Sequence, residues 1–343
     1  MKYLLSILTF LVFSVPQAFS QDYDNPVEYM SVISKQNENI SKKFMSYVSA
    51  SAHGKGARKV ENLRAKLLNE VQEARMNIAS MPSCKGDKGY RDTAVNFMKL
   101  YFNVLNEDYS KIINMEDVAE QSYDNMEAYL MAKELVDEKL EEGNVKMKQA
   151  QRSFAARNNI TLTESSTELG DMMKQIHAVN IYYKQIYLIF FRPYKQDMYL
   201  MEAVQKNNIT GIEQNKSALH KYADEGLQKL GTIPAYEGDN SILEACRDML
   251  NFYAEEVKGP ISTISEFYLA TERFETIKKE FEKKTDPSKE EIEKYNTGVN
   301  DINKASEDFN ASANALNNQR NKALNNWNKA VNSFFNEHTP HYR

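Results

Sequence analysis

Apolar residues recur at intervals of three and four along most of the chain. The pattern is clearest over residues 57–80, where it runs through Val60, Leu63, Leu67, Val71, Ala74 and Ile78. Positions three or four apart lie on the same face of an α-helix. The sequence therefore predicts a helix here that buries one apolar stripe.

Polar and Pro residues mark the helix ends in the first half of the chain. Asn25 and Pro26, followed by Glu28, are a typical helix start and predict a helix to about residue 52. Asp87 is a good cap for a long third helix, which we expect to reach about residue 157 with an interruption near Asn114.

The second half repeats this order. Ser165 or Ser166 is expected to cap a helix that extends to about residue 205. Thr210 and Glu213 have the spacing of a capping box, and the helix that they begin is expected to end at Leu230.

The two halves also match residue by residue at a constant offset of 152. Residues 81–87 and 233–239 share the motif Pro-x-x-x-Gly-Asp, and the flanking segments pair Glu61 with Glu213, Arg64 with Lys216, Leu67 with Leu219, Tyr101 with Tyr253 and Ile112 with Ile264. Two unrelated amphipathic helices can agree at their apolar positions by chance. Because the turn and the charged positions agree as well, we interpret the pattern as an internal duplication.

A 4,3 spacing extends from Tyr295 through Phe309, Leu316 and Trp327 to Phe334. This heptad pattern predicts one long helix. It suits packing in a groove of the same chain, and an oligomerisation helix is the alternative.

Composition agrees with an all-α fold, since the chain has 12 Gly and 8 Pro in 343 residues. We expect an elongated bundle of long helices. Its expected parts are a signal peptide (1–20), helical unit 1 (27–157), helical unit 2 (165–283, a repeat of unit 1) and a C-terminal long helix (287–337).

The N-terminus has the features of a secretory signal. Lys2 precedes an apolar run, and Ala18 and Ser20 stand three and one residues before a cleavage point ahead of Gln21. The run is too short to span a membrane, so we expect no transmembrane segment after cleavage. The sequence thus predicts an exported protein in the periplasm, at the cell surface or secreted.

Charge and cysteine content restrict the partners. The net charge of −5 argues against nucleic acid as the main partner. Cys84 and Cys246 are the two cysteines, and an oxidising compartment allows either a disulfide or two separate thiols.

Residues 105–116, 187–191 and 318–327 resemble a poorly characterised family of helical surface proteins of Gram-negative bacteria, some of them lipoproteins. The similarity covers nearly the whole mature chain. It implies an outward-facing location and supplies no reaction and no functional residues. This chain departs from the lipoprotein members, because it has no Cys near the cleavage point to accept a lipid.

No pattern of an enzyme, cofactor or metal site is found. The five histidines form neither H-E-x-x-H nor E-x-x-H, and G-x-S-x-G, the P-loop and G-x-G-x-x-G are absent. His338 and His341 lie in a Pro-containing tail without a third ligand nearby in sequence. We therefore predict a non-catalytic protein without a cofactor.

Two segments have a functional and a structural interpretation. Glu116, Glu120, Asp124 and Glu127 recur at helical spacing and are the candidate interaction surface, although a solvated face is the favoured explanation. Residues 181–194 are strongly aromatic, which suits a core helix bent at Pro193 or a membrane-inserting element.

The leading hypothesis is an interaction or structural protein of the bacterial cell envelope that binds a protein or glycan partner through helical surfaces. A membrane-active, pore-former-like helical protein is the first alternative. An unrecognised periplasmic ligand-binding bundle is the second, and it requires a polar pocket between the units.

Overall fold

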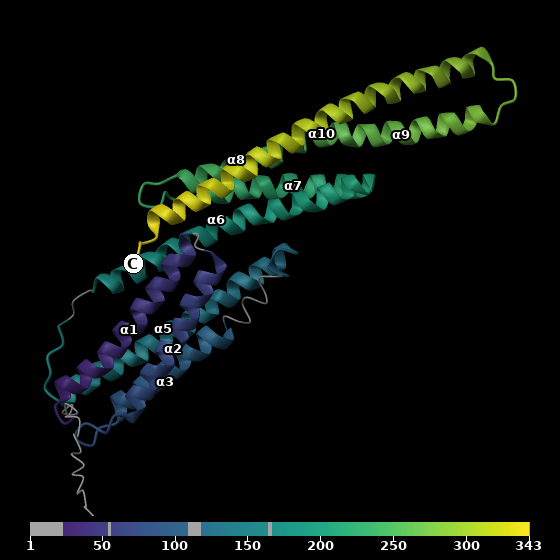
Figure 1. Ribbon diagram of the computed structural model, residues 1–343. Coiled ribbons are helices and arrows are strands. Elements are labelled where there is room, and N and C mark those ends of the chain that lie inside the picture. Colours follow the sequence, from purple (N-terminus) through teal and green to yellow (C-terminus); the bar gives the residue numbers. More distant parts are fainter. Residues whose placement is uncertain (1–22, 54–55, 109–117, 164–166, 343) are drawn as a thin grey trace, which may run out of the picture.

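The computed structural model describes residues 23–53, 56–108, 118–163 and 167–342, and the expected signal peptide lies outside them. The described residues form helices and no strand, which confirms the all-α fold (Figure 1). The elements are α1 (Pro26–Ala52), α2 (Ala57–Ser80), α3 (Gly89–Asn103), the π-helical turn η1 (Val104–Asp108), α5 (Tyr123–Arg157), α6 (Glu168–Gln205), α7 (Ile209–Leu230), α8 (Ser241–Glu256), α9 (Pro260–Glu282) and α10 (Lys289–His338).

Helix ends follow local capping chemistry, with three differences from expectation. Lys88 rather than Asp87 is the N-cap of α3, although Asp87 accepts a hydrogen bond from the N–H of Gly89 at 2.8 Å. Asn25 accepts hydrogen bonds from the backbone N–H groups of residues 27 and 28, as predicted. Asn208 rather than Thr210 caps α7, because its side chain accepts from the N–H of Gly211. Thr167 caps α6, whereas the expected caps Ser165 and Ser166 lie outside the described residues.

Helices α1, α2, α3 and α5 form one bundle, which we call the N-terminal unit. Its core contains Phe154 of α5, whose ring lies 5.6 Å from the ring of Tyr29 and 5.5 Å from that of Tyr90. All three residues are at most 1% exposed. Burial of such large rings is a main source of stability in this bundle.

Helices α6, α7 and α8 pack with the C-terminal part of α10 to form the C-terminal unit. Trp327 of α10 stacks on Phe190 at 4.2 Å between ring centroids, and Phe334 stacks on Tyr182 at 5.7 Å. Leu316 is also buried. The prediction that α10 packs against helices of its own chain is confirmed.

The two Pro-x-x-x-Gly-Asp turns have the same geometry. Lys85 and Gly86 have φ values of 50° and 84°, and Glu237 and Gly238 have 51° and 91°. The hydroxyl of Tyr29 donates to the carbonyl of Pro82 at 2.9 Å, and that of Tyr182 donates to the carbonyl of Pro234 at 2.8 Å. These matching contacts support the interpretation of an internal duplication.

The C-terminal part of α10 has the place in its unit that α5 has in the N-terminal unit. Phe334 stacks on Tyr182 as Phe154 stacks on Tyr29. The division that sets residues 287–337 apart as a C-terminal helix stays a prediction. The segment that leads to this helix is longer than the one that leads to the equivalent part of α5, so the offset of 152 residues does not extend to the match between Phe154 and Phe334.

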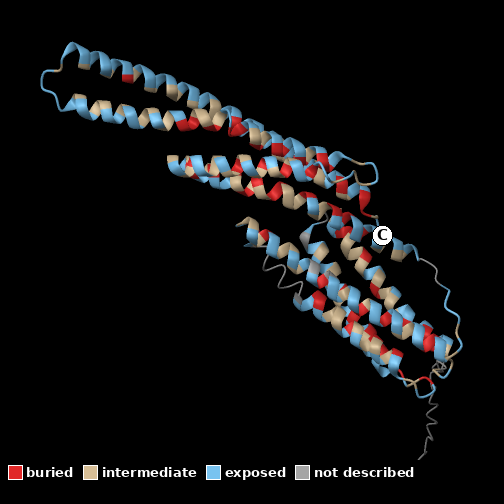
Figure 2. Ribbon diagram, turned by 180° about the vertical axis from the view of Figure 1, so that it is seen from behind, coloured by how far each residue is buried: buried red, intermediate tan, exposed pale blue. Residues whose placement is uncertain are grey.

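Residues 266–315 form an antiparallel two-helix arm, built from α9 and the first half of α10, which projects beyond the two bundles (Figure 1). Gly298 is its one buried residue. Figure 2 shows the arm mostly in the colours of exposed and intermediate residues. Half-buried rings hold its two helices together: Phe267 lies 4.6 Å from Phe309, and Phe281 lies 4.5 Å from Tyr295. The arm thus presents most of its surface to solvent.

The aromatic segment 181–194 lies within α6, and Tyr182, Ile186, Phe190 and Phe191 are buried in the C-terminal unit. Among the described helices, none combines the length and the apolar character that crossing a bilayer requires. Cys84 and Cys246 are buried free thiols in separate cores, so they do not form a disulfide.

Candidate functional site

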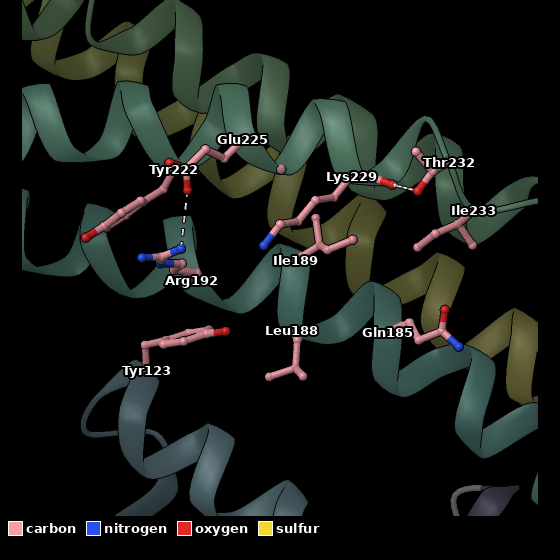
Figure 3. Close-up of a pocket in the computed structure, with 11 residues that line it drawn as sticks. Tyr123, Gln185, Leu188, Ile189, Arg192, Tyr222, Glu225, Lys229, Thr232 and Ile233 are labelled. Atoms are coloured by element: carbon pink, nitrogen blue, oxygen red, sulfur yellow. Dashed lines mark hydrogen bonds and ion pairs between the residues drawn. The ribbon is translucent and has the colours of Figure 1, made fainter.

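A pocket of about 350 Å³ lies where the start of α5 meets α6 and α7 (Figure 3). It brings together residues from both units, because Tyr123 belongs to α5 and the other lining residues belong to α6, α7 and the loop that follows α7. The lining residues are Tyr123, Gln185, Leu188, Ile189, Arg192, Tyr222, Glu225, Gly226, Lys229, Thr232 and Ile233.

Arg192 is held between two aromatic rings. Its guanidinium carbon lies 4.0 Å from the ring centroid of Tyr222 and 5.3 Å from that of Tyr123, and Figure 3 shows the guanidinium between the two rings. One of its N–H groups donates to Glu225 at 3.3 Å. A planar guanidinium that stacks on aromatic faces and pairs with a carboxylate has a fixed orientation.

The pocket has an excess of positive charge. Lys229 and Arg192 contribute two cations, and Glu225 is the carboxylate among the described lining residues. In Figure 3 the ammonium group of Lys229 extends toward the side of the pocket where Arg192 lies. Lys229 makes no salt bridge within the described part of the chain, so its charge is available to a ligand.

The floor of the pocket is apolar and depends on a glycine. A Cβ atom at Gly226 would lie 3.1 Å from Leu250 of α8 and 3.3 Å from Ile189 of α6, so a larger residue would have to push these side chains back by a few tenths of an ångström. Leu188 and Ile189 of α6 face the cavity. The site therefore combines an apolar floor with a charged and aromatic wall, as ligand sites generally do.

A second polar cluster is buried in the C-terminal unit. Arg320 of α10 donates two hydrogen bonds of 2.9 Å to Asp197 of α6 and one of 2.8 Å to Glu256 of α8. The side chain of Glu256 is 0% exposed and that of Asp197 is 5% exposed. We call these three residues the buried ionic triad.

Burial changes the protonation of the triad. Desolvation by burial, together with the nearby charge of Asp197, raises the pKa of Glu256 to about 9, and Arg320 opposes this rise only in part. Because two carboxyl groups share one guanidinium, the triad holds a proton on Glu256 at neutral pH. Neither carboxyl lines the pocket, and their burial keeps them from contact with a substrate.

Asp239, Glu337 and His338 form the group of described residues whose ligand atoms are close enough to hold a metal ion. His338 Nε2 lies 2.8 Å from Asp239, which also accepts from the N–H of Ser241. In the N-terminal unit, Arg157 makes the corresponding contact with Asp87 at 2.7 Å. In both units, a side chain at the end of a long helix thus contacts the Asp of the turn. We therefore interpret the His338–Asp239 contact as one that holds the end of α10 against this turn.

The sequence-predicted interaction surface is not brought into this pocket. Glu120, Asp124 and Glu127 are exposed, but Glu120 lies in the turn before α5, so it does not share a helix with the other two. Glu116, like the expected interruption near Asn114, lies outside the described residues. Whether these carboxylates bind a partner stays a prediction.

Sequence reasoning missed the pocket, although one signal pointed to it. Arg192 stands inside the aromatic run 181–194, where a charge breaks an otherwise apolar pattern. Such a charge indicates either a solvated position or a site. The partners Tyr123 and Tyr222 come from two other helices, and their approach to Arg192 depends on how the units pack.

Comparison of the chain with protein-family models, with curated proteins and with solved structures gave no match.

Proposed function

We propose that this chain is a non-catalytic binding protein of the bacterial cell envelope, which recognises a glycan or protein partner. The observation that carries the proposal is the pocket around Arg192. It is open to solvent, its walls hold aromatic and charged side chains, and it is lined by residues from both units. Preorganised aromatic and charged groups over an apolar floor are typical of recognition sites.

The lining residues favour binding over catalysis. Glu225 is engaged by the cations Arg192 and Lys221, at 3.3 and 3.8 Å. Acid–base catalysis of hydrolysis commonly needs a second carboxyl or a histidine beside the first. The described lining residues offer neither, and this supports a binding role.

The signal-like N-terminus supports export. The burial of the aromatic segment 181–194 favours a binding role over insertion into a membrane. Phe190 and Phe191 are at most 4% exposed, so they would reach a bilayer only if the C-terminal unit opened. The solvated arm adds a long surface on which a second contact can form.

The test is to fill the pocket. Leu188→Trp places a large ring in the cavity, and Ile181→Trp is the matched control, because Ile181 lies on the same helix, is 47% exposed and does not line the pocket. Both variants and the parent protein are applied to a glycan array and to immobilised envelope proteins. We expect the parent and the control to be retained on the same partner and Leu188→Trp to lose it. Equal retention of all three proteins would contradict the proposal.

A further inference from the structure

We infer that the pocket around Arg192 binds an acidic saccharide, with the sugar carboxylate between Arg192 and Lys229. This inference rests on the proposed binding function and names the class of ligand. Its evidence is the charge of the pocket, the orientation of Arg192 and the chemistry of the remaining lining residues.

The cations define an anion site. The guanidinium carbon of Arg192 lies over the rings of Tyr222 and Tyr123, at 4.0 and 5.3 Å from their centroids, and a guanidinium donates its hydrogen bonds in its own plane, at its edge. Glu225 takes part of that edge, through one terminal nitrogen. The remaining N–H groups and the ammonium of Lys229 suit a carboxylate, which pairs well with planar guanidinium donors.

The rest of the lining fits a sugar ring better than an acyl chain. Leu188 and Ile189 supply a small apolar surface for the C–H face of a ring. Gln185, Thr232 and Glu225 supply hydrogen-bond donors and acceptors for hydroxyl groups. An acyl chain would leave these polar groups without partners, and this costs affinity.

The size of the pocket limits the ligand. Its volume of about 350 Å³ is at the lower end of ligand pockets, which have roughly 300 to 1,000 Å³. It therefore suits one or two sugar residues at the end of a chain or exposed within it.

The inference is tested by calorimetry with digalacturonate, and with galactobiose as the neutral disaccharide of similar shape. The variants are Arg192→Gln and Lys229→Gln, and Lys216→Gln is the control, because Lys216 lies on the same helix as Lys229, does not line the pocket and pairs with Glu213 outside it. We expect digalacturonate to bind and galactobiose to bind at least about tenfold more weakly. Each pocket variant should lose about tenfold in affinity, since one charge-assisted hydrogen bond contributes roughly that much. The control should stay within about twofold.

Other outcomes separate this inference from the proposed function. If galactobiose binds as tightly as digalacturonate and Leu188→Trp abolishes both, the acidic ligand is wrong and the binding function stands. If trialanine binds with the same dependence on Arg192 and Lys229 and the sugars do not, the pocket recognises a peptide carboxylate, which overturns the saccharide. If Leu188→Trp also leaves all retention on the array and on envelope proteins unchanged, both proposals fail. Circular dichroism of Lys229→Gln, a change at an exposed residue, checks that lost binding is not lost folding.

Discussion

Val104 and Glu256 occupy corresponding positions in the two units, at the offset of 152 residues. Val104 is buried and packs with Leu140 of α5, whereas Glu256 is buried against Arg320 of α10. The spacing that relates Phe154 to Phe334 pairs Leu140 with Arg320, and the spacing that relates Tyr29 to Tyr182 pairs Phe44 with Asp197. The three ionic positions of the C-terminal unit are thus paired with apolar residues of the N-terminal unit.

This difference predicts how the triad responds to mutation. Arg320→Leu leaves two buried carboxyl groups without their cation, and loss of one partner from a buried ionic cluster costs about 3 to 5 kcal/mol. We expect the free energy of unfolding, measured by urea denaturation, to fall by that amount. A fall below about 1 kcal/mol would show that water reaches the triad.

The N-terminal unit supplies the matched control. Asp197→Phe, Glu256→Val and Arg320→Leu together copy its apolar layer into the C-terminal unit. Because apolar replacement removes the desolvation cost of the ions, the triple variant should recover most of the stability that Arg320→Leu loses. Failure to recover would mean that the two layers differ in backbone shape as well as in chemistry.

The raised pKa of Glu256 predicts a dependence of stability on pH. Its pKa is about 9 in the folded protein, against an ordinary value of 4.5. The unfolded chain releases the proton near pH 4.5, and the folded protein keeps it up to about pH 9. This carboxyl thus contributes stability that is complete below pH 4.5 and is lost as the pH rises toward 9.

Glu256→Gln isolates that contribution, because the amide does not titrate. As the pH is raised from about 5 to about 9 in urea titrations, the unfolding free energy of the parent should fall relative to that of the variant. If the difference in unfolding free energy did not change with pH, Glu256 would not be the group that keeps its proton in the folded protein.

The positive φ values in the turns predict that a residue with a Cβ atom would be strained at the glycine positions. Gly238 has a φ of 91°, and an added Cβ meets no atom within 4 Å, so the cost of Gly238→Ala arises from the backbone alone. We expect a loss of about 1 kcal/mol, as is usual for a strained φ. Gly231→Ala is the control, since Gly231 has a φ of −64° and should lose nothing. Equal thermal midpoints for the two variants would be inconsistent with the strain.

The contact between His338 and Asp239 predicts a difference between the units. The side chain of His338 is 9% exposed, whereas that of Arg157 is 53% exposed in the corresponding contact with Asp87. Solvent weakens the exposed pair. Asp239→Asn should therefore cost about 1 to 2 kcal/mol in chemical denaturation, and Asp87→Asn clearly less. The reverse order would assign the larger role to the exposed pair.

Local signals predicted the helices well and the sites poorly. The cap at Asn25 and the repeated turn are read within a few residues, so short-range chemistry determines them. Arg320 lies four residues after Leu316 and seven before Trp327, so it falls on the 4,3 stripe of α10, but this spacing does not match the cation with Asp197 and Glu256. That match depends on the register between three helices. The same applies to Arg192, whose aromatic partners come from α5 and α7.

Amide hydrogen exchange with and without saturating digalacturonate tests the central claim that the pocket between the units is the binding site. We expect slower exchange at the start of α5 near Tyr123, in α6 around Arg192 and in α7 up to Lys229, with residues 266–315 of the arm unchanged. Protection confined to the arm, or unchanged exchange around Arg192, would contradict the account.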